Sequence, residues 1–304
     1  MYRYKNNNIS LNKLNRINKH LLNIKKFYFT FRHILLHFID LIMTEQKFGI
    51  ATCSIIPLRK DPDERSEMTS QLLFGDLFEI KEISVKWSKI KTSFDNYYGW
   101  IDNKMYTIIS ESDYNKAVKK ESQIINEAVK IMTPNNEQLL LPMGSNIPFD
   151  YNGHYFTIND NFYRTDNEIV FSSINKIKAT LVKKSLKYIN SPYLWGGKTE
   201  YGIDCSGLIQ MVFRASGINL PRDASQQVDY GDTVSFVDSA EPGDVAFFDN
   251  ENGTIIHVGL LLNNNKIIHS SGFVRIDSFD HQGIFNDDKK TYTHKLRIIK
   301  RMIP

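Results

Sequence analysis

The chain has few cysteines, and they are far apart. Its 304 residues include only Cys53 and Cys205, with no CxxC pair. Two such thiols cannot build a disulfide framework or a cysteine-rich zinc site. Long uninterrupted apolar runs are also missing, which excludes an ordinary membrane-spanning helix. We therefore expect no stable insertion into a membrane.

The folded part of the chain also lacks an excess of positive charge. The formal net charge is +4, but residues 1–42 hold eight Lys and Arg and a single acid, Asp40. The other 262 residues therefore sum to about −3. A folded region this close to neutral offers no continuous basic surface for a phosphate backbone, and we expect no nucleic-acid partner.

Residues 1–42 also lack the marks of a signal peptide. They are rich in Asn and Lys, and the apolar stretch at 27–42 is broken by Arg32, His33, His37 and Asp40. A signal peptide needs a clean apolar core and a small-residue cleavage site. We expect a basic extension outside the fold, with Met43 as the true start. The alternative is a basic amphipathic helix that touches a membrane surface.

Short strands dominate residues 43–110. KFGIATCSII predicts a strand that contains Cys53 as a small packed hydrophobe, and Gly75-Asp76 predicts a hairpin turn. A second hairpin is predicted around Asp95-Asn96. Several short strands in so few residues indicate a small barrel, and the segment resembles a bacterial SH3 domain. Residues 111–171 are predicted to form a connector helix, over about 111–130, and then a second domain of this kind.

The periodicity changes from residue 172 onward. Ile174, Ile177, Leu181 and Val182 predict an amphipathic helix. A second helix is predicted to follow Asp204 and to end at Gly217. Strands VAFF, HVGLLL and KIIHSS come next. Helices followed by antiparallel strands indicate an α+β domain over 172–304.

Cys205 is predicted to lie at the start of the second of these helices, in GIDCSGL. The unpaired N–H groups and the positive dipole end of a helix start favour a thiolate and an oxyanion. Such a thiolate needs a base. With a hairpin loop at 263–265, His269 pairs with Gly259, so that His257 and His269 become diagonal neighbours on one face. We therefore expect Cys205 as nucleophile, His257 as general base and acid, and His269 as the group that orients His257.

The order DCSGL, HVG and HSSG, with PYLWGG ahead of the cysteine, resembles the NlpC/p60 cysteine peptidases. This implies a papain-like catalytic domain over 172–304. Two preceding SH3 domains, together with RSEMTSQLLFGD, PRDASQQ and VRIDSFDHQGIFN, resemble the γ-D-glutamyl-L-diamino acid endopeptidases of the YkfC type. That resemblance implies cleavage between γ-D-Glu and the diamino acid of cell-wall peptides with a free N-terminal L-Ala, which releases L-Ala-γ-D-Glu.

The same resemblance implies a substrate site between the first SH3 domain and the catalytic domain. Glu67 and Tyr98 would receive the ammonium of L-Ala, with the neighbouring Tyr97 as an alternative to Tyr98. The other implied substrate contacts come from the catalytic domain and are Tyr193, Trp195, Asp204, Ser206 and Ser225. Arg222 and Asp223 are interpreted as a structural ion pair or loop charges.

The resemblance implies no cofactor and no metal, and we expect a monomer that acts in the cytoplasm on imported wall peptides. A secreted or periplasmic location is the alternative. Three other functions remain open: a wall-peptide binding protein without activity, an amidase or endopeptidase on intact peptidoglycan, and a metal site formed by Cys205, His257 and His269.

Overall fold

The computed structural model describes residues 32, 47–120, 123–171, 177–263 and 265–303. Apart from Arg32, the expected basic extension at 1–42 lies outside these residues, and so does Ile174. Within the described part of the chain, every helix is too short or too polar to cross a bilayer.

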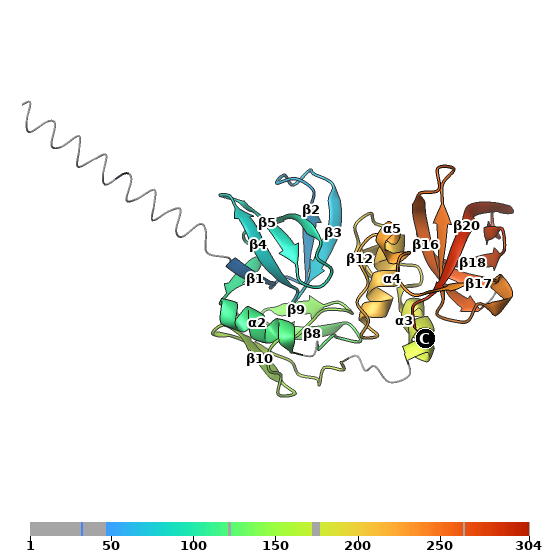
Figure 1. The fold of residues 1–304 in the computed structure, drawn as a ribbon. Coiled ribbons are helices and arrows are strands. Elements are labelled where there is room, and N and C mark those ends of the chain that lie inside the picture. Colours follow the sequence, from blue (N-terminus) through green and yellow to red (C-terminus); the bar gives the residue numbers. More distant parts are fainter. Residues whose placement is uncertain (1–31, 33–46, 121–122, 172–176, 264, 304) are drawn as a thin grey trace, which may run out of the picture. The chain divides into compact units, whose positions relative to one another are not determined.

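Seven strands form the first β module, residues 47–109 (Figure 1). They are β1 (Lys47–Ala51), β2 (Ile55–Arg59), β3 (Met68–Leu73), β4 (Leu77–Ile83), β5 (Trp87–Thr92), β6 (Tyr98–Asp102) and β7 (Tyr106–Ile109). Their order in the antiparallel sheet is β3-β2-β6-β5-β4-β1-β7. Alternating apolar side chains such as Ile56, Leu58, Phe78 and Ile90 form its core.

Two local predictions for this module are wrong. Cys53 lies in the turn between β1 and β2, because the chain reverses after Ala51 instead of continuing as one strand. The turn at Gly75-Asp76 exists, but β3 and β4 do not form a hairpin. β3 pairs with β2, whereas β4 pairs with β1 and β5. The predicted hairpin of β5 and β6 is confirmed.

The connector helix α2 is shorter than predicted and spans Glu111–Lys119. The second β module follows as a four-stranded antiparallel sheet in the order β10-β11-β8-β9. Its strands are β8 (Val129–Met132), β9 (Gln138–Leu141), β10 (Tyr155–Ile158) and β11 (Asn161–Arg164). Its core is continuous with that of the first module, since Phe74 packs edge-on against both Phe156 and Tyr163. Its assignment as a second SH3 domain stays a prediction.

The C-terminal domain, residues 177–303, begins with helices. These are α3 (Ile177–Ser185), the 3-10 turn η1 (Leu186–Tyr188), α4 (Cys205–Arg214), α5 (Ala224–Gln227) and the 3-10 turn η2 (Val237–Ser239). The predicted start of α4 after Asp204 is confirmed. A short hairpin, β12 (Lys198–Thr199) and β13 (Gly202–Ile203), precedes α4.

Seven further strands complete this domain. They are β14 (Asp232–Val234), β15 (Val245–Asp249), β16 (Ile255–Asn263), β17 (Lys266–Ser271), β18 (Phe273–Asp280), β19 (Gly283–Asn286) and β20 (Thr291–Arg301). The order β20-β15-β16-β17-β18-β19 closes on itself, because β19 also pairs with β20. Apolar side chains such as Phe248, Leu261 and Ile267 fill one side of this closed sheet. On the other side Val258 and Leu260 of β16 belong to the same apolar cluster as the side chains of α4.

Helix α4 is tied to the first β module by buried polar contacts. Arg214, near its C-terminal end, forms an ion pair with Asp76 and lies over the Phe94 ring, with its Cζ 4.2 Å from the ring centroid. One turn earlier, the Gln210 amide donates to Asp95 at 2.8 Å. Asp76 and Arg214 are at most 5% exposed, so each charge needs the other. These contacts fix the position of α4 relative to the first β module.

Replacing Arg214 with Met should lower the free energy of unfolding by about 3–5 kcal/mol, because it leaves the Asp76 carboxylate buried without its partner. Urea unfolding followed by tryptophan fluorescence measures this. Lys120→Met removes the exposed pair with Asp150 and should cost no more than about 1 kcal/mol. The double variant Arg214→Met, Asp76→Asn should recover part of the loss. Equal effects of Arg214→Met and Lys120→Met would contradict this account.

Candidate active site

Cys205 is the first residue of α4, and the residue before it anchors the helix. Asp204 is the N-cap, and its carboxylate accepts a hydrogen bond from the Gly207 amide at 2.6 Å. The same carboxylate accepts from the Gly196 amide at 2.8 Å. Gly196 has a φ of +78°, and an added Cβ there would lie 2.4 Å from the Met68 carbonyl oxygen. Only glycine fits this tight turn, which places Trp195 beside the nucleophile.

Arg222 completes the surroundings of Asp204. Its guanidinium is 1% exposed, pairs with Asp204, and donates to the Ser206 hydroxyl at 2.8 Å. Its Nε donates at 3.2 Å to the hydroxyl of Ser70 in the first β module. The interpretation of Arg222 and Asp223 as an ion pair or loop charges is wrong for Arg222, because its buried guanidinium pairs with Asp204 and not with the adjacent Asp223.

A cavity of about 450 Å³ opens above the thiol. Its lining includes five residues that the sequence predicted, namely Glu67, Trp195, Asp204, Ser206 and Ser225. Trp195 is 60% exposed and is therefore no core residue, and its indole N–H donates to Glu67 at 2.8 Å. Thr69 and Tyr97 also come from the first β module. The cavity is thus built from both the module and the C-terminal domain.

The structure corrects the assignment of Tyr98. The cavity is lined by Tyr97, whose hydroxyl lies 3.4 Å from both carboxylate oxygens of Asp223. Tyr98 is 53% exposed and lines a neighbouring groove with Lys89 and Trp100, to which Tyr97 also contributes. Tyr97 ends the turn before β6 and Tyr98 is the first residue of the strand, so a shift of one residue decides which tyrosine meets the cavity.

Asp223 also lines the cavity, a position that sequence reasoning missed. Burial raises its pKa, although Arg222 and the Tyr97 hydroxyl oppose the increase. Tyr193 is not among the residues that line the cavity, and burial, followed by the charges of Cys205 and Asp204, raises its pKa to about 12. Tyr193 therefore keeps its proton at neutral pH.

The Cys205 thiol has the opposite electrostatics to those predicted. It is 8% exposed, and burial, followed by the charge of Asp204, raises its pKa to about 12. Backbone N–H groups of Ser206 and Val258, together with Arg222, oppose this increase without overcoming it. The direction of this shift is opposite to the predicted one, because the surroundings of Cys205 disfavour the thiolate. Desolvation and a neighbouring carboxylate outweigh the helix dipole.

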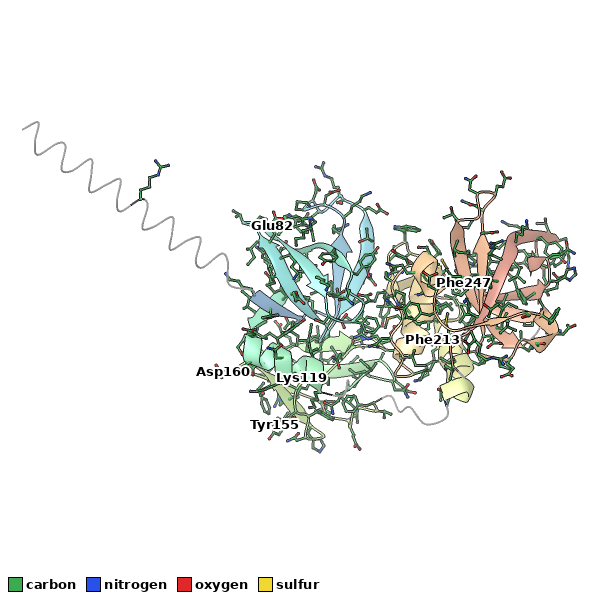
Figure 2. The ribbon with its side chains drawn as sticks, in the orientation of Figure 1. Glu82, Lys119, Tyr155, Asp160, Phe213 and Phe247 are labelled. Atoms are coloured by element: carbon green, nitrogen blue, oxygen red, sulfur yellow. The ribbon has the colours of Figure 1, made fainter. Side chains whose placement is uncertain are left out.

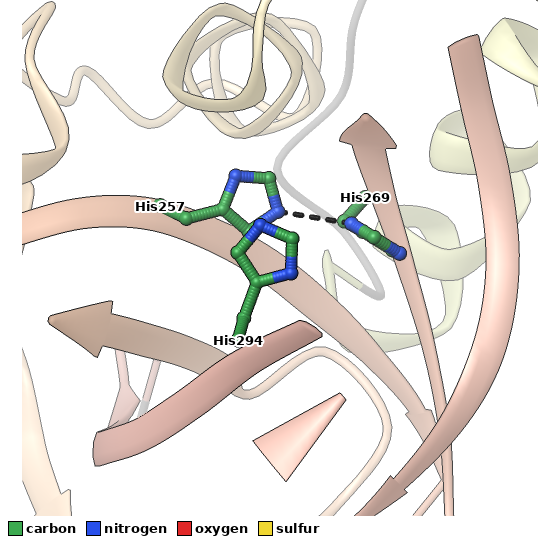
Figure 3. A group of neighbouring side chains, drawn as sticks. All are labelled: His257, His269 and His294. Carbon is green, nitrogen blue, oxygen red and sulfur yellow. Dashed lines mark hydrogen bonds between the residues drawn. The ribbon is translucent and has the colours of Figure 1, made fainter. Parts of the chain in front are cut away.

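His257 and His269 lie together as predicted. The register pairs Gly259 with His269, and the irregularity in this hairpin falls beyond Leu261, on the loop side. His257 Nε2 lies 2.9 Å from His269 Nδ1, and His269 Nε2 lies 3.0 Å from Asp277 Oδ2. Figure 3 shows the first of these contacts. Asp277 is a further member of the site that sequence reasoning did not assign. Its diagonal position to His269, across the His269–Arg275 pair, is the signal that could have revealed it.

His294 on β20 joins this group. Its ring stacks on His257 with centroids 4.1 Å apart and planes 23° from parallel (Figure 3). Burial, with the charges of His294 and His269, lowers the pKa of His257 well below its ordinary value. Nitrogen atoms of the three histidines lie within 4.8 Å of one another. The hydrogen bond between His257 Nε2 and His269 Nδ1 already occupies one nitrogen of each ring, which does not favour a metal ion shared by the three.

The thiol and the imidazole are close in the fold but not joined. The amide of Val258, the residue after His257, faces Sγ. Among the residues that the structure describes, no hydrogen bond links Sγ to the His257 ring. Catalytic hydrogen bonds often form only when substrate binds. The raised pKa of Cys205 and the lowered pKa of His257 both favour the neutral form of each group.

Known proteins resemble this chain in sequence and in fold. The NlpC/P60 family model matches residues 190–293, and a model for the bacterial dipeptidyl-peptidase SH3 domain matches residues 58–104. The chain is 34% identical over 113 residues to the gamma-D-glutamyl-L-lysine dipeptidyl-peptidase of Bacillus subtilis (strain 168). That alignment covers 36% of this chain and 38% of the relative. The chain therefore matches well under half of the relative's length.

Two longer alignments extend the likeness. Dipeptidyl-peptidase 6 of Lysinibacillus sphaericus is 24% identical over 258 residues, which cover 77% of this chain and 92% of that protein. A crystal structure of an NlpC/P60 family protein from Bacillus cereus ATCC 10987 superposes with a TM-score of 0.71. It covers 84% of this chain and 100% of that one, at 18% identity, and so bears on the fold alone. This chain therefore carries an NlpC/P60 domain preceded by a bacterial SH3 domain of the dipeptidyl-peptidase type.

Proposed function

We propose that the protein is a cysteine peptidase that cleaves cell-wall peptides between γ-D-Glu and the L-diamino acid and releases L-Ala-γ-D-Glu. The observation that carries this proposal is the single cavity that holds Cys205 of the NlpC/P60 domain together with Glu67 and Tyr97 of the SH3 domain. The relative from Bacillus subtilis is named for the same type of bond.

The reaction begins with proton transfer in the complex. The Cys205 thiol gives its proton to His257, and Sγ attacks the carbonyl carbon of the γ-glutamyl amide. The carbonyl oxygen becomes an oxyanion, which the N-terminal N–H groups of α4 and the Tyr193 hydroxyl can stabilise. His257 then gives the proton to the departing amine of the diamino acid as the C–N bond breaks. A thioester remains on Cys205.

Water completes the cycle. His257 accepts a proton from a water molecule, whose oxygen attacks the thioester carbonyl. The C–S bond breaks, the new carboxyl group leaves with the dipeptide, and the proton returns to sulfur. The general base is essential here because the thiol, with a pKa of about 12, is not ionised beforehand.

Recognition of a free N-terminus is the second part of the proposal. Glu67 and Asp223 place two carboxylates in the cavity, and an ammonium group is the complementary ligand. Burial raises the pKa of Asp223, and nearby carboxylates add to the increase, so a cation at this position would relieve an unfavourable charge. Peptides with free L-Ala are already detached from the glycan, which fits a role in recycling wall peptides.

Removing the base should abolish turnover. His257→Ala and Cys205→Ala should each lower kcat by at least about 10³-fold, and His269→Ala should cost less because His269 orients the base without touching substrate. Mass spectrometry of L-Ala-γ-D-Glu-L-Lys and of its diaminopimelate counterpart identifies the bond cut. Unchanged cleavage by Cys205→Ala would contradict the proposal.

Substrate with a blocked N-terminus should not be cleaved. Acetylation of L-Ala removes the cation that Glu67 and Asp223 would bind, so kcat/KM should fall at least about 100-fold. Glu67→Gln and Asp223→Asn should raise KM for the free peptide, whereas Asp63→Asn, a loop carboxylate outside the cavity, serves as the matched control. Efficient cleavage of acetylated peptide or intact sacculi would favour an endopeptidase of the wall instead.

The thiol should react as a neutral thiol in the absence of substrate. Since its pKa is raised to about 12, it stays protonated below that pH, and only the thiolate is alkylated. The iodoacetamide rate at Cys205 should therefore climb about tenfold per pH unit between pH 7 and 10. Peptide mapping separates Cys205 from Cys53, and Cys205→Ser gives the background. A rate that is already constant above pH 6 would show a preformed ion pair with a histidine.

A further inference from the structure

Asp277 on β18 holds the far side of the histidine pair. Its carboxylate is 1% exposed and lies outside the substrate cavity. One oxygen, Oδ2, lies 3.0 Å from His269 Nε2, and the other, Oδ1, accepts from Arg275 Nη2 at 2.8 Å. Arg275 also forms an ion pair with Asp288, whose side chain is 79% exposed. The buried carboxylate is therefore fixed in orientation by a guanidinium that is itself anchored at the surface.

This chain of contacts determines where the imidazole protons lie. An ionised carboxylate only accepts hydrogen bonds, so His269 must carry its proton on Nε2. Its Nδ1 is then a lone pair, and the neighbouring His257 Nε2, at 2.9 Å, must be the donor. A neutral His257 with its proton on Nε2 has a bare Nδ1. That nitrogen is the one left to accept the thiol proton.

We propose that Asp277 is a positioning residue that sets both histidine tautomers, and that Arg275 holds the side chain at position 277 in its orientation toward His269. The kinetic part of this inference rests on the proposed peptidase function, but the protonation pattern does not. Asp277 acts through His269 and touches neither substrate nor thiol.

Asp277→Asn tests the idea by reversing the chain of protons. Arg275 donates to the side-chain oxygen at position 277, so it should hold the amide oxygen and turn the NH₂ toward His269 Nε2. His269 must then carry its proton on Nδ1 and donate to His257, whose own proton moves to Nδ1. Nδ1 of His257 then already carries a proton and cannot accept one from the thiol. We expect kcat to fall at least about 100-fold with KM changed less than about threefold.

Arg275 provides a rescue that a purely structural role would not predict. In the double variant Asp277→Asn, Arg275→Met, nothing holds the amide oxygen outward, and it can rotate to accept from His269 Nε2. Activity should rise at least about tenfold above that of Asp277→Asn alone. Asp280→Asn on the same strand is the matched control, because Asp280 contacts Tyr292 and the Gln282 amide and neither His269 nor Arg275, and this variant should behave like the wild type. A double variant that is no more active than Asp277→Asn would overturn the role of Arg275.

Nuclear magnetic resonance of ¹⁵N-histidine-labelled full-length protein reads the tautomers without any substrate. We expect His269 and His257 to be protonated on Nε2 in the wild type and on Nδ1 in Asp277→Asn, with the folded state of each variant checked by its amide spectrum. A wild-type His269 protonated on Nδ1 would overturn the inference whatever the activity. The expected pattern in a protein that cleaves no wall peptide would instead reject the proposed function and leave the tautomer assignment standing.

Discussion

The carboxylate of Asp204 is the interaction on which the site depends. It caps α4, holds the turn at Gly196, and pairs with a fully buried Arg222 that also reaches Ser70 in the SH3 domain. A buried carboxylate is tolerated only when donors satisfy it, and here protein groups engage both oxygens. One group therefore fixes the helix start that carries the thiol and the turn that carries Trp195, and through Arg222 it adds one contact with the SH3 domain.

The Asp204 carboxylate disfavours ionisation of the Cys205 thiol, and the histidine side of the site compensates for this. Asp204 fixes the geometry of Cys205 but adds to the burial that keeps its thiol protonated. The site therefore depends on a base prepared from the opposite side, where strands β16, β17 and β18 align His257, His269 and Asp277. One carboxylate, Asp204, orients the helix start at Cys205, and the other, Asp277, holds His269 at the far end of the site.

The SH3 domain belongs to the site as much as the nucleophile helix does. Glu67, Thr69 and Tyr97 line the cavity, while Asp76 and Asp95 hold α4 through Arg214 and Gln210. Figure 2 draws the side chains of the described residues and labels Phe213 of α4 and Phe247 of β15, both of which are fully buried in the apolar cluster around α4. Directional polar contacts suit this role, because they specify the position of the helix and not merely its burial.

The sequence alone was sufficient for features that depend on residues near one another in the chain or in one hairpin. The helix start at Cys205 follows from the capping Asp204, and the shared face of His257 and His269 follows from the two-residue period of paired strands. Only the tertiary structure decided the remainder: that β3 and β4 are not partners, that Tyr97 and not Tyr98 meets the cavity, that Asp277 supports His269, and that the thiol is neutral. Each of these depends on which distant segments surround a group, and burial and charge are properties of that surrounding, not of the local sequence.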